Sequence, residues 1–240
     1  MNARSSTPSD SFIAPLSTSL RENRLVLERL VQWKGVDPGL ILSVADCAVY
    51  AIALGLIDHT DVESHLEQLA APFAPPCVQD GKETMVVDAG GRHAWLVAEA
   101  VLDLAIAAYR IGGPEVIIKS VAEPKQLGVV SAIAEKHHLS ASFEPVGDGA
   151  WRVVVGHEQV GQQSTLDRIR RHGIKADHKR WFELLALSSN ALATDTLVSR
   201  THTGSFIVKP DGSVIGRREH EFAYDDDVSM LTAETLEFRR

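Results

Sequence analysis

The hydrophobic pattern between residues 84 and 155 predicts one compact α/β unit. TMVVD at 84–88 is a short apolar run that stops at two glycines, and EVIIK at 115–119 is a second such run. Between them, residues 92–111 are apolar around most of their circumference, which predicts a largely buried helix. The order strand, helix, strand implies a parallel pair joined by a right-handed crossover.

A second helix and a hairpin complete this unit. Pro124 suits a first helical turn, and apolar residues then recur at helical spacing as far as His137. Residues 140–146 and 150–155 flank Gly147-Asp148-Gly149, which predicts a β-hairpin. We therefore expect residues 83–156 to form a small sheet with both helices packed on it.

Helices are expected on both sides of this unit. Residues 18–71 predict a helical layer, with capping boxes at SLRE and TDVE and a strongly apolar helix between them. Residues 157–218 predict a short helix, a helix capped by Asp177 and a hairpin. The expected class is α/β, of the α+β two-layer type: an N-terminal helical layer, a central strand-helix-strand-helix-hairpin unit, and a C-terminal helix and hairpin.

The domain prediction follows from where the apolar residues lie. Residues 1–17 are rich in Ser, Thr and Pro and are expected to be disordered. Residues 18–240 are expected to form a single compact domain that ends in a tail at 219–240. The apolar helices at 39–57 and 92–111 are too hydrophobic to stand in separate domains.

The amino-acid composition argues against some classes of binding partner and some compartments for this chain. The chain has 24 Lys and Arg against 32 Asp and Glu, so its net charge of -8 disfavours nucleic acid and anionic membranes. Glu99 and Asp103 fall in the middle of the most apolar helix and argue against a membrane span. Two cysteines, and an N-terminus without the apolar core of a signal peptide, predict a reducing cytoplasm.

The turn after the first strand resembles the corresponding turn in a known protein family. Asp88 and Gly91 fit the Asp-x-x-Gly turn of the small sulfur-carrier and sulfurtransferase family, whose members share the element order expected for residues 84–155. That family continues into Cys-Pro, where this chain has Ala94 and Trp95. The resemblance implies the fold and argues against persulfide transfer, because a methyl group cannot replace a thiolate.

The layout of the whole chain, and LVSRTHTGS at 197–205 most locally, also resembles a bacterial family of unknown function. That resemblance implies no reaction and no catalytic residue.

One candidate ligand site follows the first strand. Gly90, Gly91 and Arg92 open the apolar helix, whose free N–H groups and dipole suit a carboxylate or phosphate. Lys119 ends the neighbouring parallel strand, and the carboxyl ends of parallel strands form the usual binding edge of open α/β sheets. The alternative is a tight turn without a ligand, because the fuller dinucleotide or P-loop spacing is absent from the sequence.

A second candidate lies near the C-terminus. Ser199, Arg200 and His202 stand in a polar run after an apolar helix and could clamp an anion, or form an ordinary solvated loop. His93 and His202 are the candidate catalytic bases. No pair of the ten histidines has the H-x-x-x-H spacing of a zinc site, so we expect no metal, and the sequence indicates no particular cofactor.

Three functions remain open at this point. The first is a non-catalytic binding or accessory protein for a small anionic metabolite or a partner protein. The second is an enzyme acting on a small carboxylated or phosphorylated substrate, with a His base and Arg200 as the anchor. The third is a subunit of a larger complex, and a homo-oligomer is possible.

Overall fold

The computed structural model describes residues 16–157, 163–192, 207–208 and 214–215. Contacts group the chain into two units, Met1–Ala191 and Leu192–Arg240. In the second unit, β8 (Ile207–Val208) pairs antiparallel with β9 (Val214–Ile215), which is the predicted C-terminal hairpin. The extent of a single domain from residue 18 to 240 stays a prediction.

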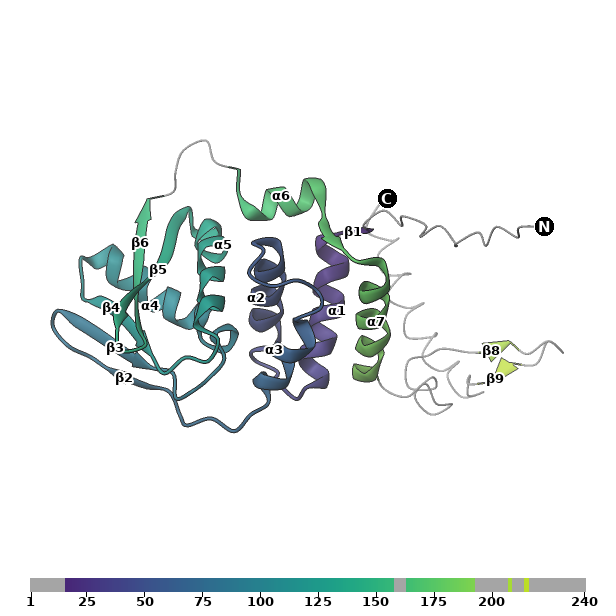
Figure 1. Ribbon diagram of the computed structural model, residues 1–240, viewed down its shortest axis with the longest axis horizontal. Coiled ribbons are helices and arrows are strands. Elements are labelled where there is room, and N and C mark those ends of the chain that lie inside the picture. Colours follow the sequence, from purple (N-terminus) through teal and green to yellow (C-terminus); the bar gives the residue numbers. More distant parts are fainter. Residues whose placement is uncertain (1–15, 158–162, 193–206, 209–213, 216–240) are drawn as a thin grey trace, which may run out of the picture. The chain divides into compact units, whose positions relative to one another are not determined.

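The first unit is built around a five-stranded mixed sheet in the order β2-β3-β4-β6-β5 (Figure 1). Its strands are β2 (Cys77–Gln79), β3 (Thr84–Asp88), β4 (Glu115–Lys119), β5 (Leu139–Gly147) and β6 (Ala150–His157). Strands β3 and β4 are parallel, and every other neighbouring pair is antiparallel. This confirms the predicted α/β class, the parallel pair and the hairpin.

Two helices cover one face of this sheet. Helix α4 (Ala98–Ile111) packs on β4 and β6, and α5 (Val130–Ala134) packs on β5. Val116 and Ile118 of β4 are buried beneath them, whereas Ile117 and Lys119 on the opposite side are only half-buried. Alternate residues of β4 therefore face the core and the outer surface, although the sequence of this strand is apolar nearly throughout.

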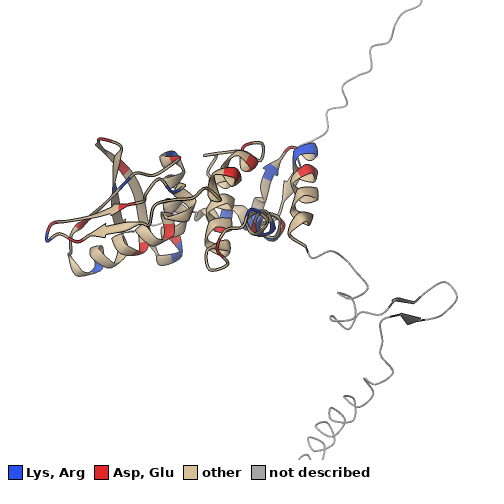
Figure 2. Cartoon of the chain, turned by 90° about the horizontal axis from the view of Figure 1, so that it is seen from below, with Lys and Arg blue, Asp and Glu red and all other residues tan. Residues whose placement is uncertain are grey.

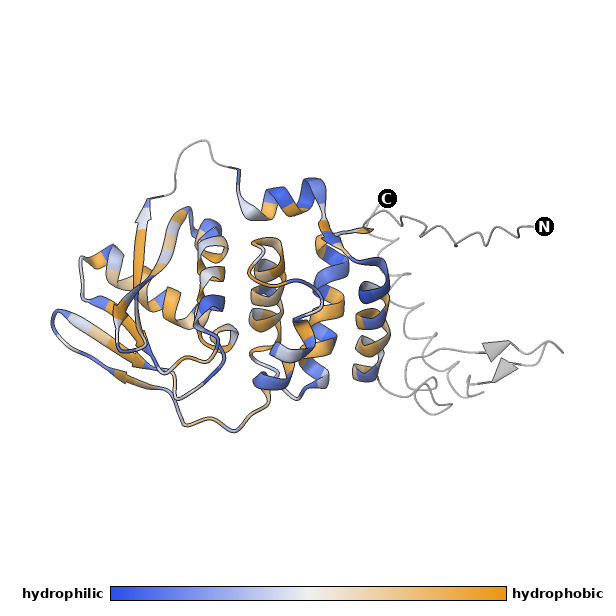
Figure 3. Ribbon diagram, in the orientation of Figure 1, coloured by the Kyte–Doolittle hydropathy of each residue, from blue (hydrophilic) through white to orange (hydrophobic). Residues whose placement is uncertain are grey.

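The remaining helices form layers on the far side of α4 and α5. Helix α2 packs on the short 3₁₀ helices η1 and η2, α1 packs on α2, and α7 packs on α1 (Figure 1). These elements are α1 (Leu20–Trp33), α2 (Ile41–Ala53), α3 (Val62–Leu69), η1 (Ala94–Leu96), η2 (Pro124–Val129), η3 (Glu135–His137), α6 (Thr165–His172), α7 (His178–Ser188) and η4 (Ser189–Ala191). The buried apolar residues of all these layers belong to one continuous core, and Figure 3 shows α2 hydrophobic along most of its length.

Three local features differ from the sequence predictions. Strand β1 (Leu16–Thr18) pairs with β7 (Ile174–Ala176), so residues 16 and 17, which were expected to be disordered, belong to a strand. Helix α3 has no side-chain cap bond: its N-cap is Asp61 rather than Thr60, and the Asp61 carboxylate accepts from the Asp58 amide outside the helix. The predicted helix at 92–111 is split into η1 and α4 at Val97, whose φ of -126° is not helical.

Acidic and basic residues are interspersed along the described helices and strands (Figure 2). Among the described residues, no helix is long and apolar enough to cross a membrane.

Candidate functional site

The turns that follow the parallel strands β3 and β4 are joined by main-chain hydrogen bonds. The amide of Ala89 donates to the Lys119 carbonyl at 2.9 Å, and that of Gly91 donates to the Ser120 carbonyl at 2.7 Å. Farther along, the amide of Ala94 donates to the Ala122 carbonyl at 3.0 Å. We call residues 88–93 and 119–123, together with His65, the β3–β4 rim.

These bonds occupy the amides that were expected to face a ligand. The Gly90 amide donates to Asp88 Oδ1 at 3.0 Å, and the Arg92 amide donates to the Ala89 carbonyl at 3.2 Å. The Arg92 guanidinium donates to the Ala74 carbonyl and lies 5.7 Å from the Phe73 ring. Gly90, Gly91, Arg92 and Lys119 do meet at one rim, and ligand binding by them stays a prediction.

Ala74, in the segment before β2, lies very close to the Gly90–Gly91 turn. A Cβ on Gly90 would lie 2.7 Å from the Ala74 carbonyl oxygen, whereas a Cβ on Gly91 would meet nothing within 4 Å. Both glycines have positive φ, at +61° and +81°. Two features therefore favour glycine at position 90: the left-handed backbone conformation, and the close approach of the Ala74 carbonyl oxygen.

Substituting alanine at each glycine separates these two requirements. We expect Gly91→Ala to lower the free energy of unfolding by about 1 kcal/mol, through the left-handed backbone alone. Gly90→Ala should lower it by about 2–4 kcal/mol, because the segment that contains Ala74 must also move. Urea denaturation of both variants measures the difference, and equal losses would show that Ala74 yields without cost.

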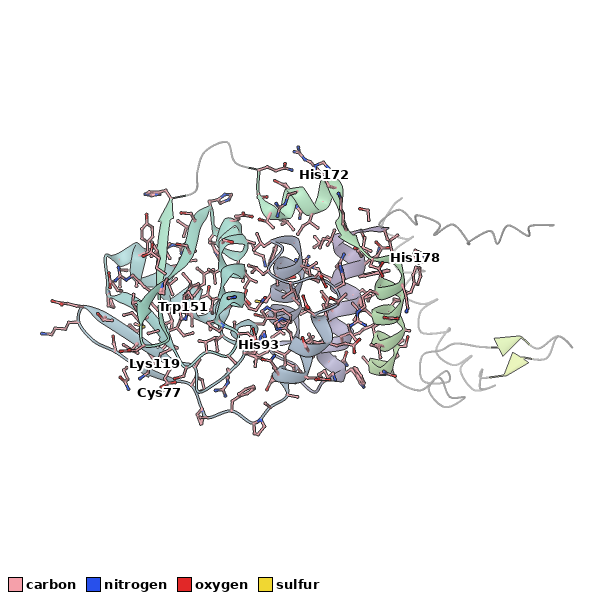
Figure 4. The ribbon with its side chains drawn as sticks, viewed as in Figure 1. Cys77, His93, Lys119, Trp151, His172 and His178 are labelled. Atoms are coloured by element: carbon pink, nitrogen blue, oxygen red, sulfur yellow. The ribbon has the colours of Figure 1, made fainter. Side chains whose placement is uncertain are left out.

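The outer face of the sheet carries a short row of polar groups at the rim. In the strand register, Asp88 lies between Cys77 of β2 and Lys119 of β4, two residues labelled in Figure 4. Lys119 Nζ is 3.5 Å from Asp88 Oδ2. Hydrogen bonds from the Gly90 amide and the Ser120 side chain, and then the charge of Lys119, lower the pKa of Asp88. Asp88 is therefore held as a carboxylate and offsets the positive charge of Lys119.

Two residues of the rim have a strained backbone. Ser120 and Glu123 have φ of 56° and 53°, although neither is glycine. Left-handed conformations of such residues cost roughly 1–2 kcal/mol and occur preferentially at functional sites. The strain marks the loop after β4 as a place where side-chain position matters.

A pair of buried histidines lies directly beneath this loop. His65 Nδ1 is 2.9 Å from His93 Nε2, with His93 fully buried and His65 7% exposed. The amide of Trp95 donates to His93 Nδ1 at 3.2 Å, so that nitrogen carries no proton. In a neutral His93 the proton must then be on Nε2, which donates to His65 Nδ1. The single proton of a neutral His65 is consequently on its outer nitrogen, Nε2.

Burial keeps both imidazoles neutral. Desolvation first, and the neighbouring His65 second, lower the pKa of His93 to about 3. Desolvation also lowers the pKa of His65, and the negative charges of Glu123 and Asp61 oppose that shift. At neutral pH both rings of the pair are therefore uncharged.

A third buried histidine, His59, belongs to a different network. His59 Nε2 is 3.2 Å from Asn23 Oδ1, and the Asn23 amide group donates to Thr18 Oγ1 at 2.8 Å. Burial is the main cause that lowers the pKa of His59. This network ties α1 to the loop before α3.

The other sequence candidates are three residues near the C-terminus and two carboxylates of α4. Ser199, Arg200 and His202 lie outside the described residues. Glu99 is half-buried and Asp103 exposed, as expected for the solvent-facing stripe of α4. No group of three or more His, Cys, Asp or Glu that could hold a metal ion occurs in the described part of the chain.

His65 was missed because nothing near it in the sequence marks it. Its partner lies 28 positions away, and only the fold brings the two rings together. Two cavities in the described part of the chain, of about 450 and 600 Å³, are lined by other residues, including Arg168 and Arg152 respectively.

Among known proteins, the chain shows similarity only in comparisons of structure, not in comparisons of sequence. No family model matches the chain, and no curated protein matches its sequence. Malate dehydrogenase from Entamoeba histolytica has a TM-score of 0.44 at 13% identity, covering 74% of this chain and 62% of that one. Delta1-piperideine-2-carboxylate reductase from Pseudomonas syringae has 0.42 at 21%, covering 62% and 51%. A putative malate/lactate dehydrogenase from E. coli has 0.40 at 10%, covering 94% and 83%.

The predicted resemblances are therefore wrong. The similar solved structures are dehydrogenases and a reductase rather than a sulfur carrier, and no family model supports the resemblance of layout. The site itself agrees with this correction, because Ala94, at the position of the carrier cysteine, is fully buried. The chain spans 62% and 51% of the first two structures.

Proposed function

We propose that this chain is an enzyme acting on a small carboxylated substrate, which binds at the β3–β4 rim. One observation carries the proposal: the buried His65–His93 pair, whose hydrogen bonds allow only one arrangement of protons. The outer nitrogen of His65 is thereby fixed as a donor for a carbonyl or carboxylate oxygen.

A neutral donor of this kind favours an enzyme over a simple anion-binding protein. A protein that only holds an anion gains more from a charged Arg or Lys, because charge-assisted hydrogen bonds are stronger. A neutral imidazole instead stabilises an oxygen on which negative charge develops, without giving its own proton away. Strained residues beside such a donor are typical of active sites.

The roles of the two histidines follow from their bonds. His93 cannot serve as a base for a substrate while both of its ring nitrogens are engaged inside the protein. It acts as a positioning residue that sets the orientation and proton arrangement of His65. Lys119, on the same rim, offers a positive charge for a substrate carboxylate, although Asp88 partly neutralises it.

Calorimetric titration tests the proposal. The panel comprises 2-oxo acids, 2-hydroxy acids and dicarboxylates, each with and without nucleotides. We expect His65→Asn to weaken the binding of at least one compound 10-fold or more, about 1.4 kcal/mol. The Asn oxygen can still accept from His93, and only the outer N–H is lost.

The control is His172→Gln, which changes an exposed histidine on α6 (Figure 4). It should leave affinity unchanged. Absence of any binding that depends on His65 would contradict the proposal. Binding without turnover of any tested compound would instead favour the accessory function.

A further inference from the structure

A polar cavity is lined by residues of α5, η3, α6 and the start of β5. Its volume of about 450 Å³ falls within the range of roughly 300–1,000 Å³ that is usual for small-molecule sites. None of the described residues that line it belongs to the β3–β4 rim. Leu54, Leu139 and Ala141 supply the apolar part of the lining, and the rest is polar.

One set of polar lining groups offers hydrogen-bond acceptors. The Glu135 carboxylate accepts from the amide and the hydroxyl of Thr165, at 2.6 and 3.0 Å, and both of its oxygens keep lone pairs for further donors. The hydroxyls of Ser131 and Ser140 each donate to a main-chain carbonyl, at 2.9 and 3.0 Å. Their oxygens can therefore accept from a ligand. This acceptor set carries one negative charge.

A second set, from α6, offers donors. Arg168 donates one N–H to the Ala53 carbonyl at 2.9 Å and forms no ion pair with another described residue. Most N–H groups of its guanidinium are thus available to a ligand. Ser164 Oγ accepts from the Asp167 amide at 3.1 Å, and its hydroxyl hydrogen has no acceptor among the described residues. This donor set carries one positive charge.

Thr165 brings the two sets to the same cavity. It is 6% exposed, and its two hydrogen bonds to Glu135 join α6 to η3. Arg168 follows Thr165 by three positions on α6, so the two side chains lie on one face of that helix. Glu135 and Arg168 both line the cavity, yet no ion pair joins these two described residues. Their opposite charges therefore stand unpaired in one lining.

We propose that this cavity binds a free amino acid with a small side chain, at a site separate from the β3–β4 rim. The ammonium group of the amino acid, which has only donors, binds Glu135, Ser131 and Ser140. Its carboxylate accepts from Arg168 and Ser164 through charge-assisted hydrogen bonds. The apolar lining residues contact its side chain.

The charges of the lining distinguish this ligand from simpler ones. A plain anion would share the cavity with the Glu135 carboxylate, and a plain cation would share it with the Arg168 guanidinium, so like charges would oppose either ligand. An apolar compound would leave both charges and the hydroxyls without partners. A small zwitterion has a partner for each set.

Calorimetric titration of the full chain with glycine, L-alanine, L-serine, L-valine and L-leucine tests the ligand class. For each amino acid that binds, we titrate the corresponding acid without the ammonium group and the corresponding amine without the carboxylate. Each analogue should bind at least about 10-fold more weakly, because it lacks one charged contact. An analogue that binds as tightly as its parent, or absence of binding by every amino acid, overturns the proposal.

Substitutions locate the binding. Arg168→Gln keeps a donor for the Ala53 carbonyl and removes the charge, so it should weaken binding at least about 10-fold. Arg168→Lys keeps the charge and should weaken it less. The control, Arg171→Gln, changes an exposed residue of α6 that does not line the cavity and should leave affinity unchanged. Unchanged affinity in Arg168→Gln overturns this site.

Two further variants complete the test. Glu135→Gln keeps an oxygen that can accept from Thr165 and removes the negative charge, so it should also weaken binding. If this variant unfolds, the Arg168 variants and the analogues still decide the outcome. His65→Asn should leave amino-acid binding unchanged, and its loss in that variant would place the ligand at the rim and overturn the separate site. Failure of this proposal leaves the proposed function standing, because the two depend on different residues.

Discussion

Lowering the pH from 7 to 5 should reduce the free energy of unfolding by about 2 kcal/mol through His93 alone. The folded pKa of His93 is about 3, and in the unfolded chain it returns to about 6.5. Between these values the unfolded chain binds more protons than the folded one, so stability falls as the pH falls. His59 and His65 have lowered pKa values and add losses of the same sign.

Urea unfolding at pH 7, 6 and 5 measures this effect. The lowered pKa values of Glu22, Asp58 and Asp88 act mainly below this range, so the loss between pH 7 and 5 reports on histidines. His93→Gln keeps a donor toward His65 and lacks the titrating group, and its stability should fall less steeply with pH. Equal stability at pH 7 and 5 would contradict a neutral buried His93.

Removing the ring of Trp95 should have the largest effect of any single substitution named here. Trp95 is 1% exposed, and its ring centroid lies 4.8 Å from that of His93 and 5.1 Å from that of His65. We expect Trp95→Ala to lower the free energy of unfolding by about 3–5 kcal/mol, because it leaves a large cavity beside two buried polar rings. Chemical denaturation measures the loss, and a change below about 1 kcal/mol would show that the site collapses to fill the space.

Trp95→Phe provides the matched comparison. Trp95 Nε1 is buried and has no hydrogen-bond partner among the described residues. Replacing the indole with the apolar ring of Phe removes this unpaired N–H donor, and that loss does not by itself lower the free energy of unfolding. The variant should lose only about 1 kcal/mol or less, from its smaller volume. A loss as large as that of Trp95→Ala would indicate that the indole N–H has a partner.

The sheet could be predicted because its signals are local. Short apolar runs, the Gly147–Gly149 turn and the glycines after β3 and the apolar helix each lie within a few positions of the element they define. The pairing of β1 with β7 could not be predicted in this way. Leu16 pairs with Ala176, and three-residue strands carry too little pattern to be recognised.

The position of the candidate site was easier to predict than its chemistry. Adjacent parallel strands had to bring the Gly90–Gly91 turn and Lys119 to one edge, and the structure does so. The sequence did not reveal that the turn amides would bond to the neighbouring loop. It also did not reveal His65, because α3 meets η1 only through tertiary packing and no local motif accompanies a buried imidazole pair.

Nitrogen-15 NMR of the histidine side chains tests the central claim most directly. Two-bond correlations distinguish Nδ1–H, Nε2–H and doubly protonated rings, and His65→Asn and His93→Gln assign the signals. At pH 7 both rings should be neutral with the proton on Nε2, and His93 should stay neutral at pH 5. A doubly protonated ring at pH 7, or a proton on Nδ1 of either residue, would contradict the account of the rim.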